Sequence, residues 1–384
     1  MNRVPGWRRE PYRVLFPLGL LMAWAGVLHW FLYGLGLLPD YRPVFHSIVQ
    51  IQGFMICFAG GFLLTAIPRR TGTAPPAAWQ MLAVAGAPVG STLAAWFQSW
   101  ALSQVFWMLL MIVLLGFAVP RFLSAGATRR PPNSFLWVPF SLAMGIGGSC
   151  LIGVYGVLGD EYYLLHELGR SLLLEGMFLG LVLGIGGMAL PLITRGDAPP
   201  DAGGSAGDRL SRVTHLAAAV LLAGSFYVEV YLSLRGGLAL RAAVVLVTLL
   251  VSSRIHRPPA VPGSHRWLVW LAAWMIPAGY LTAFLFAAQK KAGLHAVFIG
   301  GFALMALSVG LHVILAHGGH ERLVRGRPWQ VPVYGGLIVA SVVLRALVDF
   351  DPQRFFVWIT AASGLFLAST LIWASLALPN LWQD

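Results

Sequence analysis

Residues 100–122 read WALSQVFWMLLMIVLLGFAVPRF, and the first charged residue in this stretch is Arg121. A helix that spans a bilayer needs about 20 consecutive, mostly apolar residues, because the hydrocarbon core is roughly 30 Å thick. Residues 100–122 meet that requirement. They therefore predict a helix that crosses a membrane.

The rest of the chain repeats this pattern. Similar apolar windows lie at 14–36, 45–67, 78–97, 135–158, 165–193, 212–234, 237–255, 266–288, 293–315, 330–350 and 354–378. Of the 384 residues, 58% are hydrophobic and 10% are charged, whereas a soluble domain carries about 25% charged residues. We therefore predict an all-α fold, a polytopic integral membrane bundle of about 12 transmembrane helices. The count is open at one place, since only Gln98 and Ser99 separate window 78–97 from window 100–122.

The distribution of lysine and arginine predicts how these helices are oriented. Short cytoplasmic loops carry an excess of both residues. With the N-terminus inside, 18 of the 26 Lys and Arg residues fall on the cytoplasmic side, 7 fall on the outer side, and Arg170 lies within a window. We therefore predict that both termini are cytoplasmic. The same spread over many short loops argues against nucleic-acid binding, which uses basic residues clustered on one face.

A linker rich in Gly, Pro and Asp divides the windows six and six. It covers residues 196–211 and begins GDAPPDAGGSAGD. Such a composition predicts a flexible cytoplasmic connection. We therefore predict a first six-helix half, 1–195, and a second six-helix half, 212–384. Twelve helices with a central hinge also suit a secondary transporter, although no repeat between the halves is visible.

Four histidines from four different windows fall at one depth. His29 lies toward the outer end of the first predicted helix, and His46, His166 and His295 open the second, sixth and tenth windows on the same side. Imidazole is a ligand of haem iron and of copper, and helical bundles build metal sites from facing helices. The four histidines therefore predict a metal or haem site near the outer face. The alternative is that they form hydrogen bonds at the membrane interface.

The same layer contains charged side chains. Arg170 and Arg345 lie within it, as do Glu167, Glu175 and Glu229. Arginine binds carboxylates well, including the propionate groups of haem. Arg170 and Arg345 are therefore candidate cofactor-binding residues, and ion pairing with glutamates inside the bundle is the alternative for both.

A second group of histidines, His312, His317 and His320, lies at the inner end of the tenth window. A straight helix from His295 to His317 is roughly 33 Å long, at about 1.5 Å per residue. The two groups therefore cannot bind the same ion. Residues 318–319 are both glycine and predict the end of the helix. A second metal site and a capping or surface role are both open for this group.

Three segments resemble the NnrS family of polytopic bacterial membrane proteins. His46 is followed by GFMICFAGGFLLTAIPRRTG at residues 53–72, and residues 294–320 read LHAVFIGGFALMALSVGLHVILAHGGH. A weaker match is GGMALPLIT at residues 186–194. His46, His295 and His317 match histidines of the family. The sequence departs from the family pattern at Ile48, Val49, Met188, His312 and His320.

The resemblance implies a haem- and copper-containing protein of the bacterial cytoplasmic (inner) membrane, linked to nitric-oxide or nitrosative stress. His46 and His295 would be the principal ligands, with His166 and His29 as alternatives and His317 as a further candidate. Catalysis is open. If it occurs, we expect a metal-dependent redox reaction on a small molecule such as nitric oxide, which could arrive through lipid. The rival interpretation is a twelve-helix secondary transporter or metal-delivery permease, without a stoichiometric cofactor.

Overall fold

The computed structural model describes residues 5–124 and 126–382 of the chain. Helix accounts for 84% of the structure, and the described residues contain no strand. The all-α prediction is confirmed. Eleven helical segments among these residues are long and apolar enough to cross a membrane: Tyr12–Gly34, Pro43–Thr71, Trp100–Leu123, Asn133–Leu158, Asp160–Arg195, Ala206–Leu232, Leu234–Ser253, Ser264–Leu285, Ala287–His317, Gln330–Phe350 and Pro352–Asn380. The protein is therefore a polytopic membrane protein in contact with lipid.

The chain forms two compact units that interleave along the sequence. Unit 1 comprises the chain up to Leu15, Ala59–Leu192 and Ala198–Arg254. Unit 2 comprises Phe16–Phe58, Ile193–Asp197 and the chain from Ile255 onward. The division into two six-helix halves at the linker 196–211 stays a prediction.

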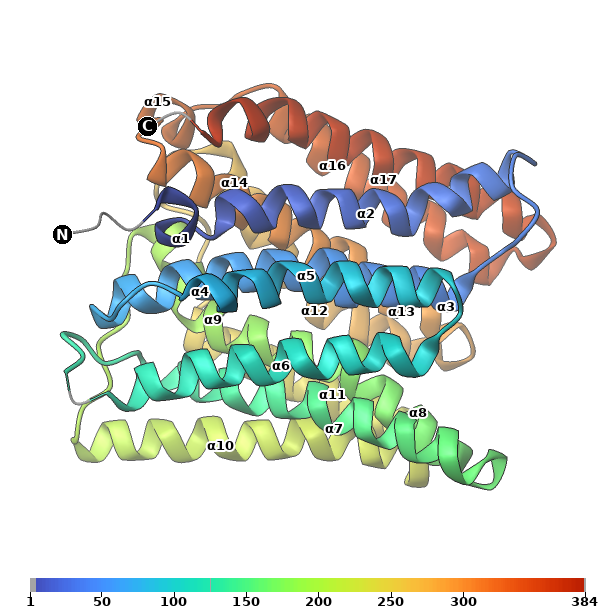
Figure 1. Ribbon diagram of the computed structural model, residues 1–384, viewed down its shortest axis with the longest axis horizontal. Helices are drawn as coiled ribbons and strands as arrows, with labels where there is room; N and C mark the ends of the chain where they lie inside the picture. The colour runs from blue at the N-terminus through green and yellow to red at the C-terminus, as the bar shows by residue number, and fades with distance from the viewer. Residues whose placement is uncertain (1–4, 125, 383–384) are drawn as a thin grey trace. The chain divides into compact units, whose positions relative to one another are not determined.

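Unit 1 contains α1 near the N-terminus and the helices of the middle of the chain. They are α1 (Gly6–Arg9), most of α4 (Ile56–Thr71), α5 (Ala78–Trp96), α6 (Trp100–Leu123), η2 (Asn133–Leu136), α7 (Trp137–Leu158), η3 (Asp160–Tyr162), α8 (Tyr163–Ser171), η4 (Leu172–Gly176), most of α9 (Met177–Arg195), α10 (Ala206–Tyr227), η5 (Val228–Leu232), α11 (Leu234–Thr248) and η6 (Leu249–Ser253). Helix α7 packs against α6, α8 and α10, and α10 also packs against α11. Figure 1 shows α6, α7 and α10 running side by side.

Unit 2 contains helices from both ends of the chain. They are most of α2 (Tyr12–Gly34), α3 (Pro43–Ile48), η1 (Val49–Met55), α12 (Ser264–Leu285), η7 (Ala287–Gln289), α13 (Lys290–His295), η8 (Ala296–Ala303), α14 (Leu304–His317), α15 (Glu321–Arg325), α16 (Gln330–Phe350), η9 (Pro352–Arg354), α17 (Phe355–Ala377) and η10 (Leu378–Asn380). Helix α16 packs along α17 and against α13, while α12 packs against α13, η8 and α14. Figure 1 shows the neighbouring α16 and α17 in red.

The predicted window 78–97 forms helix α5, but this helix is not among the eleven apolar segments. Polar residues and a proline interrupt it, including Pro88, Ser91 and Thr92. The Ser91 hydroxyl lies 2.8 Å from the Ser103 hydroxyl of α6, so part of its polar surface faces the neighbouring helix. A tight turn separates the two helices, with Gln98 at a φ of 58°. Windows 78–97 and 100–122 are therefore two helices.

Helices α12 and α13 approach each other closely at two glycines. A Cβ atom at Gly279 would lie 2.7 Å from the carbonyl oxygen of Gly293, and a Cβ atom at Gly293 would lie 2.4 Å from that of Gly279. Small residues allow membrane helices to make such contacts. Because both obstacles are backbone atoms, a larger side chain would have to push the helices apart.

We expect Gly279→Val to lower the midpoint of thermal unfolding in detergent, because overpacking costs about 1–3 kcal/mol. The matched control is Gly336→Val in α16, since a Cβ atom there would meet no atom within 4 Å. The control is expected to change the midpoint little. Equal midpoints for the two variants would contradict the close approach of α12 and α13.

Candidate functional site

Four side chains that the sequence singled out come together in unit 2. His29, His46, His295 and Arg345 belong to α2, α3, α13 and α16, respectively. His46 interacts electrostatically with His29 and Arg345, and His295 interacts with His46 and Arg345. Three of the four predicted histidines and one arginine therefore lie within electrostatic range of another member of the group, and a shared site made by them stays a prediction.

The ring of His46 is held by the backbone of α2. Its Nδ1 atom lies 2.7 Å from the carbonyl oxygen of Gly26. A carbonyl oxygen only accepts hydrogen bonds, so Nδ1 carries the hydrogen, and a neutral ring then has its lone pair on Nε2. Nearby, the side-chain amide of Gln50 donates to the carbonyl oxygen of Ala23 at 3.0 Å. Two hydrogen bonds therefore attach the α3–η1 segment to α2.

Trp30 fixes the same imidazole from one face. Its indole stacks on the His46 ring with centroids 3.7 Å apart and planes 15° apart. The ring of Tyr41 also stacks on Trp30, with a centroid distance of 5.2 Å. Burial raises the pKa of Tyr41 to about 12, so this phenol keeps its hydrogen at neutral pH. Trp30 packs against Val348 and Ile359, which anchor the aromatic group in the core of unit 2.

His295 has the same hydrogen-bond pattern as His46. Its Nδ1 atom lies 2.8 Å from the carbonyl oxygen of Lys291, one turn earlier in α13. The hydrogen is again on Nδ1, and the lone pair of the neutral ring is on Nε2. A π-helical segment, η8, begins at the next residue, and another, η1, begins three residues after His46. Such wide turns occur frequently at functional sites.

Arg345 is a buried cation beside these rings. Its side chain belongs to a residue that is 7% exposed, and Nη1 donates to Asp349 at 3.1 Å. In the described part of the chain, its Nε makes no hydrogen bond. The guanidinium therefore keeps donor capacity for an anionic group.

His29 is the most enclosed histidine of this cluster. It is 5% exposed, and its ring contacts Phe45 edge-on at a centroid distance of 5.2 Å. Neither ring nitrogen makes a hydrogen bond of standard geometry to another described residue, although backbone groups of Ala25 and Arg42 lie near the ring. Buried polar groups are normally satisfied. His29 therefore has unused hydrogen-bonding or ligating capacity.

His166 and Arg170 belong to unit 1, both on α8. The His166 ring lies between those of Tyr155 and Tyr163, at centroid distances of 4.9 and 6.2 Å. Arg170 pairs with Glu167 at 2.8 Å, which is the ion pairing that the sequence left as the alternative. Roles of His166 and Arg170 in binding a cofactor stay predictions.

Towards its C-terminal end, α14 carries a histidine that pairs with a histidine of α12. The sequence did not connect these two residues. The Nδ1 atom of His312 lies 3.0 Å from Nε2 of His265, which is 1% exposed at the start of α12. His265 lies 47 positions away along the chain, and no motif links the two residues. Helix α14 ends at His317, and Gly319 follows with a φ of 71°. The predicted glycine stop is confirmed.

Sequence reasoning also missed Trp30, Tyr41 and Arg241. The two aromatic residues look like ordinary members of the membrane interface, and only the folded chain shows that Trp30 stacks on His46 and Tyr41 on Trp30. Arg241 was counted among the seven basic residues of the outer side, yet it is fully buried within α11. That count was wrong for Arg241, because the residue already lies within the predicted window 237–255.

Within the described residues, no three His, Cys, Asp or Glu side chains are placed to hold a metal ion together. The unit 2 cluster instead offers individual imidazoles and a guanidinium. A haem would bring most of the ligands of its own iron, so the protein would need to supply only one or two imidazoles. His46, His295 and the guanidinium of Arg345 are groups that could hold it.

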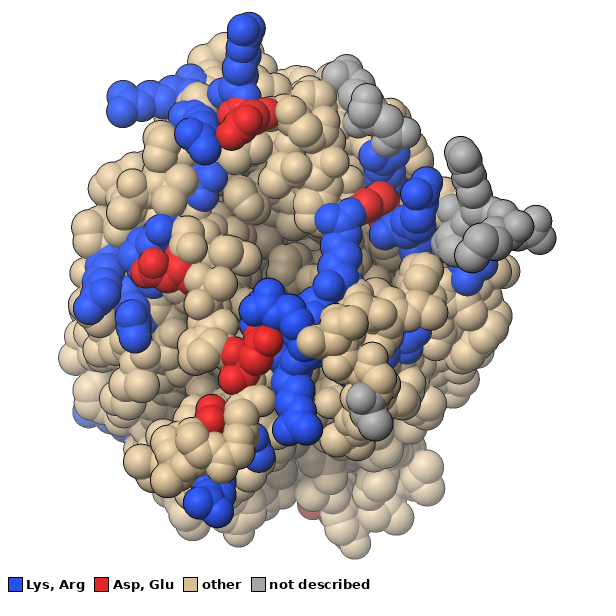
Figure 2. Space-filling model, turned by 90° about the vertical axis from the view of Figure 1, so that its left-hand side faces the viewer, with Lys and Arg blue, Asp and Glu red and all other residues tan. Residues whose placement is uncertain are grey.

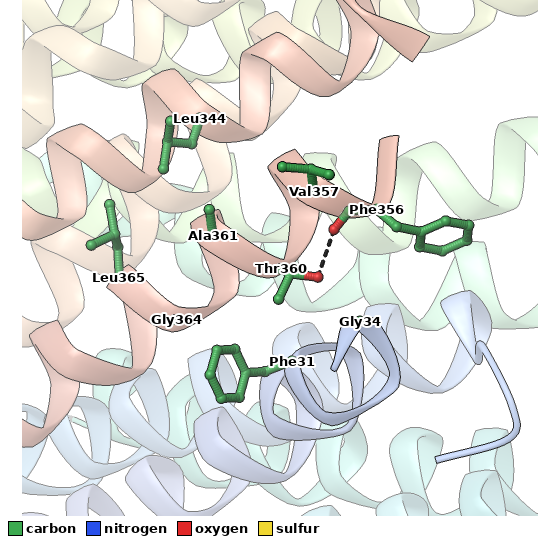
Figure 3. Close-up of a pocket in the computed structure, with 9 residues that line it drawn as sticks. All are labelled: Phe31, Gly34, Leu344, Phe356, Val357, Thr360, Ala361, Gly364 and Leu365. Atoms are coloured by element: carbon green, nitrogen blue, oxygen red, sulfur yellow. Dashed lines mark hydrogen bonds between the residues drawn. The ribbon is translucent and has the colours of Figure 1, made fainter. Parts of the chain in front are cut away.

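An open groove of about 510 Å³ lies beside α2, α16 and α17. Figure 3 shows its lining, which is apolar apart from Thr360. The Thr360 hydroxyl donates to the carbonyl oxygen of Phe356 in the same helix. The groove therefore suits an apolar molecule and offers no ligand for an ion.

These features define a polytopic helical membrane protein with histidines and an arginine gathered inside one unit. The family model described as "NnrS protein" matches residues 6–384, which is essentially the whole chain. The chain therefore belongs to the NnrS family, and the resemblance seen in the sequence is confirmed. No curated protein matches the chain.

We expect Trp30→Leu to lower the midpoint of thermal unfolding measured by circular dichroism, because two aromatic pairs are lost at about 0.5–1.5 kcal/mol each. Trp30→Phe keeps a ring and should recover part of the loss. Trp329→Leu is the control, since Trp329 is 61% exposed at the start of α16. Equal effects of the Leu substitutions at 30 and 329 would refute a role for the stacked rings.

Proposed function

We propose that this protein binds haem through His46 and His295 and acts in tolerance of nitric oxide or nitrosative stress. The observation that carries this proposal is the hydrogen-bond pattern that the two imidazoles share. Each donates Nδ1–H to a backbone carbonyl and keeps the Nε2 lone pair for a ligand. Histidines bound to metals are commonly held by this kind of hydrogen bond, which fixes the tautomer and raises the basicity of the ring.

The charges around the two rings support the same proposal. Arg345 would pair with a carboxylate of the cofactor through the part of its guanidinium that Asp349 does not use. Arg170 of unit 1 stays a predicted cofactor-binding residue. His29 and His166 stay alternative ligands and His317 stays a further candidate, and copper is the other proposed cofactor.

Bound haem would supply a redox-active iron that can bind a small neutral gas. The protein's own residues bind and orient it: His46 is fixed by Gly26 and Trp30, and His295 by its own helix. The buried aromatic residues around Trp30 exclude water from this part of unit 2. Tyr41, whose phenol stays protonated, can donate a hydrogen bond. Whether the bound gas is converted or only held is the open part of the proposal.

We expect purified protein to contain haem and to show a Soret band, and His46→Ala and His295→Ala each to lower haem content at least about tenfold. The measurement is the pyridine haemochrome assay, with protein folding checked by gel filtration. His256→Ala is the control, because this histidine is exposed in a loop. A wild-type protein without a Soret band, or full haem content in both variants, would refute the site.

We further propose twelve crossings, with α5 as the twelfth and both termini in the cytoplasm of a bacterium. In unit 1 the segment before α5 lies next to the end of α6, since Arg121 of α6 donates to the carbonyl oxygen of Ala74 at 3.1 Å. The backbone N–H of Thr128 donates to the carbonyl oxygen of Thr71 at 2.9 Å. Helix α6 is long enough to cross, so α5 would cross in the opposite direction.

The ion pairs of unit 1 support the orientation. Arg69 pairs with Glu10, and Asp201 of the linker pairs with Arg70 and, at 3.0 Å, with Arg129. All five residues lie in segments that the lysine and arginine distribution assigns to the cytoplasm. Figure 2 shows basic side chains spread over one face of the molecule, with single acidic side chains among them.

We expect green fluorescent protein fused to the C-terminus to fluoresce, because it folds in the cytoplasm. Alkaline phosphatase inserted at the α5–α6 turn should be active, because the turn would face outward. With eleven crossings and the N-terminus in the cytoplasm, both results would be reversed, because nine crossings follow the turn. Eleven crossings that start outside would leave both results unchanged, but green fluorescent protein fused to the N-terminus would then be dark. Either reversal would contradict the proposed topology.

The rival function, a secondary transporter or metal-delivery permease, is favoured by the buried charges of unit 1. It requires flux of a substrate in proteoliposomes and no stoichiometric cofactor. The haem assay on wild-type protein therefore separates the two functions directly. Bound haem together with loss of that haem in the His46 and His295 variants would exclude the permease as the primary function.

A further inference from the structure

Unit 2 contains a buried arginine in the first turn of a membrane-spanning helix. Arg266 is the third residue of α12 and is 6% exposed. Its Nη1 donates to the carbonyl oxygen of Ile193, in the last turn of α9. Its Nε is buried and makes no hydrogen bond to any residue that the structure describes. The edge of the guanidinium that Nε and Nη2 form is therefore left for a second acceptor.

Across residues 5–124 and 126–382, no carboxylate pairs with Arg266. Its electrostatic neighbours are Arg325, His265 and His312, none of which is acidic. Arg325 already pairs with Glu321 at 3.2 Å, and both of these side chains are exposed. The carbonyl oxygen that Nη1 contacts carries only a partial negative charge. Because burying a charge without a counter-ion is costly, the surroundings of Arg266 favour an anion.

The start of α12 adds further groups that seek an acceptor. No side chain caps this helix, and its first turn contains no acidic residue. The N-terminus of a helix carries a partial positive charge, equivalent to about half an elementary charge. The Ser264 hydroxyl, on the first residue of α12, is buried and has no hydrogen-bond partner in the described chain. A hydroxyl, a guanidinium edge and a helix N-terminus thus share one turn.

The side chain of Arg266 lies over the start of its own helix. Gly263, the residue before α12, has a φ of 139°, a conformation that favours glycine. A Cβ atom at Gly263 would lie 3.0 Å from Arg266 Nε and would also meet the carbonyl oxygen of Val324. The backbone N–H of Ser264 donates to the carbonyl oxygen of Gly326 at 3.1 Å. Arg266 Nε therefore lies at the N-terminus of α12, where the end of α15 crosses it.

We propose that the N-terminus of α12 binds a phosphate group, with Arg266 and Ser264 as its ligands. Phosphate oxygens accept parallel hydrogen bonds from a guanidinium edge, and helix N-termini bind phosphate through their N–H groups and dipole. A third oxygen can accept from the Ser264 hydroxyl. A metal cation does not suit this place, because a permanent positive charge already occupies it.

A phosphate group can reach this place from two sources. Helix α12 is a membrane-spanning segment, so its first turn lies near the level of the lipid headgroups. Trp267 and Arg325 beside the site are exposed. The phosphate can therefore belong to a phospholipid headgroup that approaches from the bilayer, or it can be inorganic phosphate from water. Neither source depends on a haem in unit 2.

Binding to the delipidated full-length protein in detergent tests the site in two arms. Native mass spectrometry follows phosphatidylglycerol in one arm, with diacylglycerol, which lacks the phosphate, as the negative control. Titration calorimetry follows inorganic phosphate in the other arm, with chloride as the negative control. We expect Arg266→Gln to weaken binding at least about tenfold, because hydrogen bonds to a charged group are lost. Ser264→Ala should weaken binding by a smaller factor.

Arg322→Gln is the matched control, because it removes the same charge from an exposed position on α15. Its affinity should equal that of the wild type. Binding that depends on Arg266 in the lipid arm identifies a headgroup, and the same result in the other arm identifies inorganic phosphate. Absence of binding from both arms, equal binding of the negative controls, or unchanged affinity of Arg266→Gln overturns the site. Gel filtration verifies folding, and Ser264→Ala decides if Arg266→Gln does not fold.

Discussion

A bilayer core contains no water that could satisfy a polar group, so the backbone polar groups in it must find their partners within the chain. This constraint explains both the uniform helicity and the placement of the few polar side chains. Backbone hydrogen bonds are satisfied inside each helix. Side chains such as His46 and Arg241 are instead held by carbonyl oxygens, hydroxyls and carboxylates of neighbouring segments. Where a polar group sits in this structure is therefore decided by which partners the packing provides.

The same constraint gives the two units different chemistry. In unit 2, His46 and His295 each donate a hydrogen bond from Nδ1 to a backbone carbonyl. The uncharged ring then has a lone pair on Nε2 that can bind a ligand. In unit 1, Arg241 donates to the carboxyl groups of Glu175 and Glu229. A neutral lone pair favours a metal centre, whereas Arg241 and the two glutamates are partners for one another.

Much of this could be predicted from the sequence, because long apolar runs determine helices in a membrane almost by themselves. Counting residues along those helices predicted that His29, His46, His295 and Arg345 lie at a common depth. All four lie in unit 2, where they interact electrostatically. Counting could not reveal Trp30 as the ring beneath His46, since stacking depends on how α2 meets α3. It also failed for His265, whose partner comes from a distant helix. For α5, the sequence predicted the helix correctly. Its apolar character was too marginal to decide whether the helix crosses the membrane.

The π-helical segments have a consequence for how relatives of this protein should be compared. Each wide turn contains an extra residue, and one residue corresponds to roughly 100° of rotation around a regular helix. Residues before and after η1 or η8 therefore follow different angular registers, and a helical wheel drawn straight through either segment would assign the wrong faces. A homologue with one residue fewer at such a place could keep every contact beyond it by winding the turn regularly. Single-residue gaps in the middle of these helices would then record a change in winding, and not an error of alignment.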